Sequence, residues 1–525
     1  MNTKSLLPLL FGLLCVPALA QDVDYPDEFA EPMGLHPESM GDFHYPISSD
    51  SELAQEYFDQ GFQLMYAFAK TDAARSFYAA HQADPDCAIC YWGEAWAWGS
   101  YLNGAMTTAE APRAWQALQQ ALTHIGNASA KEADMIRALE SRYVEDFDPA
   151  ERRQQDQAYA DAMAELAAKY PEDLDIQTLY ADSLFLLEER RGYRSLEDPN
   201  VVRLHGVLLG VLEKDIRHPG ACHLLIHATE STPTPELAAP CARFLGYSIP
   251  GASHINHMPS HTWNEMGLWH DAVRSNTIAW HSDQKAAFGQ GFAIYPTHNL
   301  TMLYYAAAMG GESASSIQAA KDLAKLNGNS AMWAMSLVRF GRFDEVMELD
   351  QAPNGEVNRA MYDFSKAYAA LKEGDMEQAR SAQAELAELT ETTTSRFRFH
   401  DGADIIGTLA HILAGEILWS EGNIEGAAAE FRTATDYYDS LNYDEPEPLP
   451  FSPRHWLGAA YIELGAYDRA VEEYRIDLLD HPHNIWSLFG IQQALKATGE
   501  NDPVVDKDLF EAFSYADIWL PGTKF

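Results

Sequence analysis

The sequence predicts an all-α fold in which helical hairpins stack into a right-handed α-solenoid. Small residues recur at fixed positions ahead of large apolar ones, and proline follows the second helix of a pair, while β-rich runs are scarce. A chain of 525 residues also exceeds the roughly 250–300 residues that one hydrophobic core holds. It must therefore form several domains or a repeat array, and the recurring hairpin pattern favours the array.

The clearest repeat lies near the end of the chain. Eight residues there fit the 34-residue tetratricopeptide template, namely Leu457, Gly458, Tyr461, Gly465, Tyr467, Ala470, Tyr474 and Pro482. A similar pattern spans residues 57–85. Further turn glycines at 341, 374 and 422, with the one at 465, are 33, 48 and 43 residues apart. These unequal spacings predict tetratricopeptide-like hairpins in an irregular array.

The start of the chain has the pattern of an export signal. Lys4 precedes an apolar run at 6–16, and Ala18-Leu19-Ala20 forms a small-x-small cleavage site. We therefore expect an exported protein, periplasmic in a Gram-negative source, with a signal peptide at 1–20 and an irregular acidic lead-in at 21–50. N-terminal tetratricopeptide-like helices are expected at 51–195, a His-rich helical core at 196–312 and C-terminal repeats at 313–525. No later stretch approaches the ~18 uninterrupted apolar residues of a membrane span, so no integral membrane segment is predicted.

The charge balance narrows the classes of partner. Asp and Glu number 78 against 36 Lys and Arg, which gives a formal net charge of −42. Such a field repels nucleic acid and anionic membranes and attracts cations, although solubility alone also explains it. We therefore expect a small-molecule substrate or a protein or peptide partner, and no nucleic acid. The sequence does not indicate an oligomeric state.

Histidines are concentrated between residues 218 and 298, where nine of the 19 lie. His223 and His227 are four residues apart, and so are His257 and His261, a spacing that puts two imidazoles on one helix face. We predict a transition-metal site whose ligands are these four histidines, with His298 as the fifth.

The metal is predicted only by class. Neutral imidazoles suit copper, iron or zinc. With His254 and His298 the six histidines are enough for a binuclear copper pair, whereas four with a carboxylate would suit iron or zinc. Glu230, three residues beyond His227, is our catalytic candidate as a general base, and it also suits a ligand or an acceptor for an imidazole N–H.

Three common enzyme motifs are excluded by the sequence, whereas a purely structural role for the histidines stays open. His-Leu-Leu-Ile-His lacks the glutamate that follows the first histidine in the zincin motif, and the chain shows no glycine-rich phosphate loop and no serine nucleophile elbow. Inter-helix histidines also fix the packing of polar cores through hydrogen bonds, here to Glu230, Asn256, Ser260 or Asn264. The tryptophans and tyrosines of residues 91–101 and 263–280 are expected mainly in the core, with some walling an apolar pocket above the metal.

Four cysteines follow the predicted signal. Cys87, Cys90, Cys222 and Cys241 allow two disulfides with three connectivities in an oxidising compartment. A structural Cys87–Cys90 bridge is favoured over a redox motif because no βαβ pattern surrounds it. A bond between Cys222 and Cys241 would join the helix of His223 to the next one, and Cys222 as a metal ligand is the alternative.

The chain resembles a family of bacterial and fungal tetratricopeptide-repeat proteins, most of them uncharacterised. The resemblance covers most of the chain after residue 50 and rests on the histidine motifs HPGACHLLIHATE, HMPSH and YPTHNL, with VRFGRFDEV and NIWSLFGIQQAL. It implies a helical fold with a histidine cluster and no established substrate. The segment LLEERRGYRS at 186–195 departs from the family pattern, so substrate preference is expected to differ if that segment lines the site.

Two functional classes follow from these patterns. The first is an exported metalloenzyme, redox or hydrolytic, that acts on a small molecule. The second is a periplasmic tetratricopeptide adaptor for protein–protein interaction, whose histidines are structural or store metal.

Overall fold

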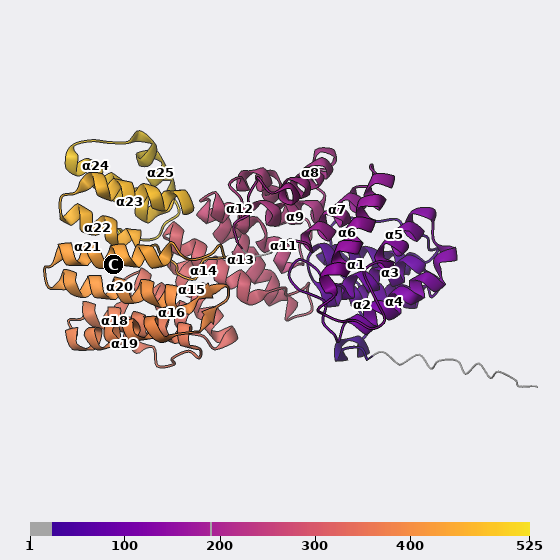
Figure 1. Ribbon diagram of the computed structural model, residues 1–525, viewed down its shortest axis with the longest axis horizontal. Coiled ribbons are helices and arrows are strands. Elements are labelled where there is room, and N and C mark those ends of the chain that lie inside the picture. Colours follow the sequence, from indigo (N-terminus) through magenta and orange to yellow (C-terminus); the bar gives the residue numbers. More distant parts are fainter. Residues whose placement is uncertain (1–23, 189–191) are drawn as a thin grey trace, which may run out of the picture.

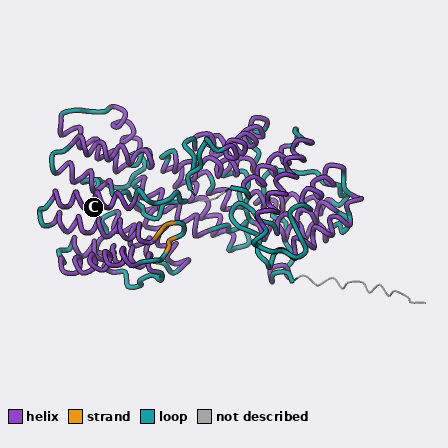
Figure 2. Tube along the Cα trace, in the orientation of Figure 1, coloured by secondary structure: helices purple, strands orange, loops and turns teal. Residues whose placement is uncertain are grey.

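The protein is an array of α-helices that runs from one end of an elongated molecule to the other (Figure 1). The computed structural model describes residues 24–188 and 192–525, so the predicted signal peptide at 1–20 lies outside the described residues. Within these ranges the strands are confined to one short antiparallel hairpin, β1 (Arg396–Phe397) and β2 (His400–Asp401), coloured orange in Figure 2. The predicted all-α solenoid of helical hairpins is confirmed.

The first part of the array is built from seven helices, each packed on a neighbour in sequence, after a lead-in that contains only 3-10 helices among its described residues. The lead-in holds η1 (Asp27–Ala30) and η2 (Pro37–Ser39). The helices are α1 (Glu52–Tyr66), α2 (Lys70–Ala83), α3 (Ala88–Trp98), α4 (Ala111–Thr123), α5 (Ala130–Glu140), α6 (Arg152–Lys169) and α7 (Leu174–Phe185), with η3 (Ile125–Asn127) between α4 and α5.

The middle part contains several short helices and all the histidines of the candidate site. Its elements are α8 (Pro199–Lys214), α9 (Pro219–Thr229), η4 (Pro235–Ala238), α10 (Ala239–Leu245), α11 (Ser253–His257), α12 (Pro259–Glu265), α13 (Trp269–Ala286) and α14 (Pro296–Gly310). Here the packing departs from strict sequence order, because α9 contacts α1 and α12, and α11 contacts α14. This crossing of non-consecutive helices brings the histidine motifs together.

The last part returns to regular hairpins. Its helices are α15 (Ser313–Asn327), α16 (Ala331–Arg339), α17 (Phe343–Glu348), α18 (Glu356–Lys372), α19 (Met376–Thr392), α20 (Gly402–Ser420), α21 (Ile424–Tyr438), α22 (Arg454–Glu463), α23 (Tyr467–Asp480), α24 (Ile485–Thr498) and α25 (Pro503–Phe513). The part also touches the middle of the molecule, where Trp269 Nε1 donates to Pro482 O at 2.9 Å and Trp486 Nε1 donates to Ala308 O at 3.0 Å.

Glycines facing aromatic rings explain why the hairpins pack so closely. A Cβ atom on Gly61 would lie 2.9 Å from the Phe77 ring, and one on Gly415 would lie 2.3 Å from the Phe431 ring. Gly458 meets Tyr474 at 2.3 Å in the same way. In all three pairs the aromatic residue follows the glycine by 16 positions, so one local spacing sets the contact between the two helices of a hairpin.

Filling one of these contacts should destabilise the array. A Gly458→Ala substitution would put its Cβ atom 2.3 Å from Tyr474 Cζ, and the ring is held from its other side by Gly490. We expect the free energy of unfolding to fall by about 1–3 kcal/mol, as overpacked cores do. Chemical denaturation would measure it, with Gly210→Ala on α8 as the control because a Cβ there meets nothing within 4 Å. Equal stability of the two variants would contradict the packing argument.

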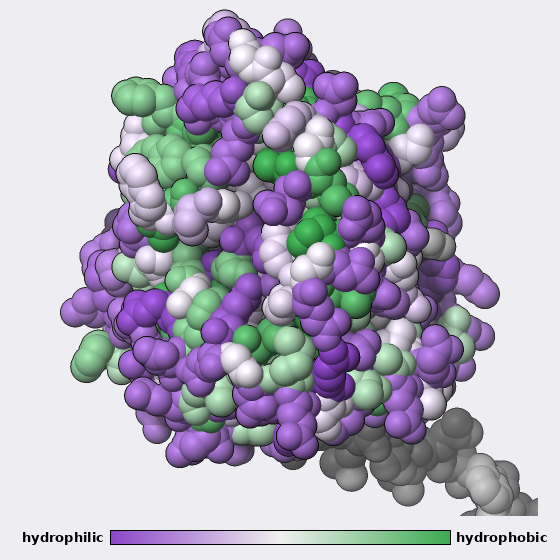
Figure 3. Space-filling model, turned by 90° about the vertical axis from the view of Figure 1, so that its left-hand side faces the viewer, coloured by the Kyte–Doolittle hydropathy of each residue, from purple (hydrophilic) through white to green (hydrophobic). Residues whose placement is uncertain are grey.

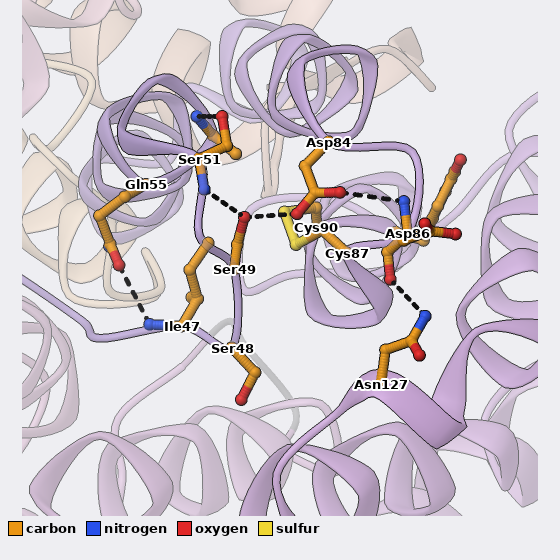
Figure 4. The surroundings of a disulfide bond; sticks show 12 residues. Ile47, Ser48, Ser49, Ser51, Gln55, Asp84, Asp86, Cys87, Cys90 and Asn127 are labelled. Carbon is orange, nitrogen blue, oxygen red and sulfur yellow. Dashed lines mark hydrogen bonds between the residues drawn. A yellow bond between two sulfur atoms is a disulfide. The ribbon is translucent and has the colours of Figure 1, made fainter.

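All four cysteines of the described residues are paired. Cys87 bonds to Cys90 and Cys222 bonds to Cys241. Figure 4 shows the first bond at the junction of α2 and α3, where Asp84 accepts from Ser49 Oγ and from the Asp86 amide. The second bond joins α9 to α10. Cys222 is therefore a structural cysteine, as the first alternative of the sequence analysis held.

One helix among the described residues is long and apolar enough to cross a membrane. It is α20, and 67% of its apolar window is buried inside the protein between α19 and α21. That burial is the pattern of a core helix in a repeat array. Figure 3 shows the face of the molecule formed by the C-terminal helices. Hydrophilic side chains cover most of this face, and apolar groups are scattered between them.

Candidate metal centre

Helix α9 carries the first histidine pair, and a capping residue followed by proline sets its start. His218 occupies the N-cap and its Nδ1 accepts the Ala221 amide at 3.1 Å, while Pro219 sits at the first helical position, where a missing N–H costs nothing. One helix then places His223 and His227 on the same face, as predicted.

The second histidine pair spans a helix boundary. We predicted one continuous helix through His257 and His261, and that prediction is wrong, because α11 ends at His257 and α12 begins at Pro259. Proline has no amide hydrogen and its ring clashes with the carbonyl four residues earlier, so the helix breaks at Met258. The break leaves His254 and His257 on one short helix and His261 on the next.

The last histidine lies in the first turn of α14. Tyr295 is the N-cap of this helix, in the left-handed region with φ of 56°, and Pro296 follows at the first position. The Asn299 side chain is held by other groups, since its Nδ2 donates to Ile294 O at 3.1 Å and to Asp283 Oδ2 at 2.8 Å. These bonds fix the turn that presents His298.

Six imidazoles meet between these helices in two groups of three. Triad A consists of His223, His227 and His254, and triad B consists of His257, His261 and His298. In each triad the potential ligand atoms lie within 4.8 Å of one another. The triads are adjacent, since the ring centroids of His254 and His257 are 5.5 Å apart and those of His227 and His261 are 5.4 Å apart. All five predicted ligands are therefore brought together, and His254 completes the set.

Four of the six imidazoles have an acceptor at Nδ1 that orients the ring. Nδ1 of His223 lies 2.6 Å from Tyr66 O, and Nδ1 of His257 lies 2.7 Å from Asn276 Oδ1. Asn276 is itself fixed, because its Nδ2 donates to Ala272 O at 2.9 Å. A proton on Nδ1 leaves the lone pair on Nε2, which is the form of histidine that ligates metals.

Glu230 provides the Nδ1 acceptor for one histidine of each triad. Its Oε1 lies 2.9 Å from Nδ1 of His227, and its Oε2 lies 2.6 Å from Nδ1 of His261. Both oxygens thus face imidazole nitrogens, the arrangement of a carboxylate that orients two ligands. A catalytic role for Glu230 stays a prediction. A second carboxylate, Glu445, joins His227, Glu230 and His261 in an alternative group that could hold an ion.

Two contacts in the site call for a positive ion. Nε2 of His261 lies 2.8 Å from Nε2 of His257. With both Nδ1 atoms against acceptors, neutral imidazoles would bring two lone pairs face to face there, and these repel unless a proton or a metal ion lies between them. Metal–nitrogen bonds near 2.0–2.1 Å put two ligand nitrogens roughly 3 Å apart, which matches this spacing.

In triad A, His254 also indicates that a positive ion binds. It is 1% exposed, and neither of its ring nitrogens has a hydrogen-bond partner among the described residues. A buried imidazole with both nitrogens unsatisfied costs free energy unless something binds them. The sequence contained one signal for this residue, its spacing of three from His257.

Burial disfavours the charged form of two of the imidazoles, those of His254 and His257. Desolvation, and next the neighbouring His223 and His257, hold the pKa of His254 well below its ordinary value of 6.5. Desolvation and next His261 lower the pKa of His257 in the same direction. For Glu230 burial raises the pKa, but the attraction of His261 outweighs it and the net pKa is lowered. Neutral imidazoles beside an ionised carboxylate are the protonation states that metal ligation requires.

Aromatic side chains wall the site on one side. The Phe68 ring lies 4.2 Å from the His223 ring between centroids, and the Tyr295 ring lies 5.0 Å from the His254 ring. Tyr295 also shares a 2.7 Å hydrogen bond with Tyr101. Phe68 and Tyr295 both have positive φ, of 60° and 56°, a strained conformation for a bulky residue that recurs at functional sites.

A cavity of about 540 Å³ opens onto the other side, and His261 and Glu445 belong to its wall. Residues from several distant segments line it, including Tyr193 and Arg194, Tyr305, and the loop 443–447. Tyr193 and Arg194 belong to the 186–195 segment that departs from the family pattern, of which residues 189–191 lie outside the described residues. Two residues of that segment therefore line the cavity.

Histidines outside the triads have ordinary structural partners. Nε2 of His205 lies 2.9 Å from Ala228 O, and Nδ1 of His270 lies 3.1 Å from Glu312 Oε1. His281 is exposed on α13. The residues that complete the site without a sequence signal are Phe68, Tyr66, Asn276 and Glu445, because each comes from a helix or loop distant from the histidine motifs.

Comparisons with known proteins give no functional lead. No family profile matches the chain, and no curated protein matches it either. Solved structures of similar helical character include the APC/C hetero-tetramer Cut9-Hcn1 (TM-score 0.30, 13% identity, 88% of this chain and 77% of that one). The P58(IPK) TPR domain (0.22, 12%, 88% and 98%) and yeast Tom70 (0.29, 11%, 88% and 100%) are others. At these TM-scores the similarity carries no argument about function.

Proposed function

We propose that this protein is an exported metalloprotein that binds two transition-metal ions, one in each histidine triad, and uses them on a small molecule in the adjoining cavity. The observation that carries the proposal is the orientation of the imidazoles. Acceptors hold Nδ1 of four of them, and the six histidines gather as two groups of three. Three protein ligands per ion leave a coordination position for a substrate.

Copper is the best match to this donor set. Each triad offers three imidazoles and no carboxylate, whereas iron in helical proteins is typically held by carboxylates together with histidine. Zinc also accepts three imidazoles and is the second choice. Bound copper would supply redox chemistry and bound zinc Lewis-acid chemistry. The chain's own residues orient the imidazoles, keep them neutral and shield them with Phe68 and Tyr295.

Export agrees with the cysteine chemistry. Both pairs of cysteines after the predicted signal form disulfides, which persist in oxidising compartments and are rare in the cytosol of mesophiles. Metal loading is then expected after export, in the same compartment where the disulfides form.

The direct test is the metal content of the protein itself. Untagged protein purified from the exported fraction should contain about two transition-metal ions per chain by plasma mass spectrometry, since each triad holds one. Copper should be the metal retained when copper and zinc are offered together at equal concentration, because copper binds such sites more tightly.

Three results would count against the proposal. Absence of bound metal after reconstitution with copper, zinc and iron would refute the proposed metal-binding function. One ion per chain would favour the alternative group around Glu230 and Glu445. Two bound ions without redox turnover or hydrolysis of any small molecule would favour the storing adaptor over the enzyme.

A further inference from the structure

The cavity beside triad B is markedly acidic. Its wall carries six carboxylates against three basic side chains, Arg194, His481 and the predicted ligand His261. The acids are Glu236, Glu265, Asp444, Glu445, Glu447 and Asp480. The whole chain adds a net charge of −42, so cations are drawn toward this opening.

Two of these carboxylates are already neutralised by the protein. Asp444 pairs with Arg398 at 3.0 Å and with His400 at 3.1 Å. Glu447 lies 3.0 Å from Nε2 of His481 and also accepts from Tyr305 Oη at 3.2 Å. Arg194 is held by backbone, since its Nη1 donates to His227 O at 2.6 Å. None of these ion pairs and hydrogen bonds reaches Glu236, Glu265 or Asp480.

Glu236 and Asp480 are exposed, whereas Glu265 lies deeper in the cavity wall. It is half-buried, and it makes no ion pair or hydrogen bond within the described residues. Burial, and next the neighbouring Glu447 and Glu230, raise the pKa of Glu265 well above its usual 4.5. A bound cation would relieve that repulsion.

A second polar group without a partner lies next to it. Asn264 lines the same cavity, is 8% exposed, and its Oδ1 is buried with no hydrogen-bond partner in the described part of the chain. An unpaired buried acceptor costs about 1–3 kcal/mol unless a donor reaches it. A carboxylate and an amide oxygen together form a receptor for a small molecule that carries a positive charge and a hydrogen-bond donor.

We propose that this cavity binds small organic cations, and that Glu265 is the residue that selects them. The aromatic rings of Tyr193, Tyr305 and Tyr443 line the same space and offer faces to a positive group. Glu265 follows His261 by four residues on α12, so the two side chains lie one helical turn, about 6 Å, apart on one face. A substrate held by its ammonium or amidinium group at Glu265 would therefore present a position a few bonds away to triad B.

This inference rests on the proposed function for its link to the metals, but binding of a cation is testable without them. Choline, its neutral isostere 3,3-dimethylbutan-1-ol and the anion 3,3-dimethylbutyrate share one shape and differ in charge. Titrated into metal-free protein and followed by NMR or calorimetry, choline should bind at least about tenfold more tightly than the neutral isostere. The anion should bind more weakly than both.

The isosteric variant Glu265→Gln should lower choline affinity about tenfold, to that of the neutral isostere, and leave binding of the neutral molecule unchanged. Glu425→Gln, an exposed residue on α21, is the matched control and should bind like the wild type. Unchanged helical circular dichroism and melting temperature show that a variant is folded.

The outcomes separate the two proposals. Equal affinity for choline and its neutral isostere, no detectable binding of any probe, or wild-type choline affinity in Glu265→Gln would overturn the cation-selective cavity while the metal content stands by itself. Selective choline binding by protein that takes up no metal would keep the cavity and overturn the proposed function.

Discussion

Protein in which His223 and His227 are both replaced by glutamine should retain about one metal ion per chain instead of about two. The double substitution leaves triad A with His254 alone, while His257, His261 and His298 stay intact in triad B. The reciprocal variant, His257→Gln with His261→Gln, should also retain about one ion, because a single imidazole binds far more weakly than three. Glutamine approximates the volume of the imidazole, so the helices should persist.

Matched controls make this result specific. His281→Gln on the exposed face of α13 should keep two ions. The alternative group of His227, Glu230, His261 and Glu445 draws one histidine from each pair, so a single shared ion there would be lost in both double variants. Complete loss of metal in both would therefore refute two independent triads, and full retention in either would show that its pair is not ligating.

Asp477→Ala is expected to have the largest effect on stability of the changes considered, about 3–5 kcal/mol in the free energy of unfolding. Asp477 is 2% exposed and receives hydrogen bonds from four side chains. Asn484 Nδ2 donates at 2.9 Å and Ser487 Oγ at 2.6 Å, and the rings of His455 and His481 lie 3.2 and 3.0 Å away. Its removal leaves these donors buried without a partner. Chemical denaturation measures the loss.

The neighbouring Glu472→Ala on the exposed side of α23 is the control and should change stability by less than about 0.5 kcal/mol. Asp477 should also contribute pH dependence. Burial raises its pKa, but His455 and His481 outweigh burial and hold the pKa well below 3.8. Its stabilisation is therefore present above about pH 4 and lost as the pH falls through the folded pKa, so the stability difference from Asp477→Ala should shrink at low pH. A constant difference down to pH 2 would contradict this assignment.

Much of the fold was predictable because its signals are local. Gly61 and Phe77, Gly415 and Phe431, and Gly458 and Tyr474 each lie 16 residues apart, and that spacing alone sets how two consecutive helices pack. The pair His223 and His227 shares one helix face by the same short-range geometry. The five predicted ligands could be chosen from the sequence because each belongs to a spacing or motif that is visible within a few residues.

Only the tertiary structure decided how those residues are grouped. The sequence suggested His223, His227, His257 and His261 as ligands, with His254 and His298 added for a binuclear pair. Packing of α9 on α12 and of α11 on α14 divides these six histidines into two triads. The helix break at Met258 puts His257 and His261 on separate short helices, and Asn276, Tyr66 and Glu445 complete the site from distant segments. Local spacing determines helices and their immediate neighbours, but contacts between non-consecutive helices depend on how the whole array packs, and that has no short-range signature in the chain.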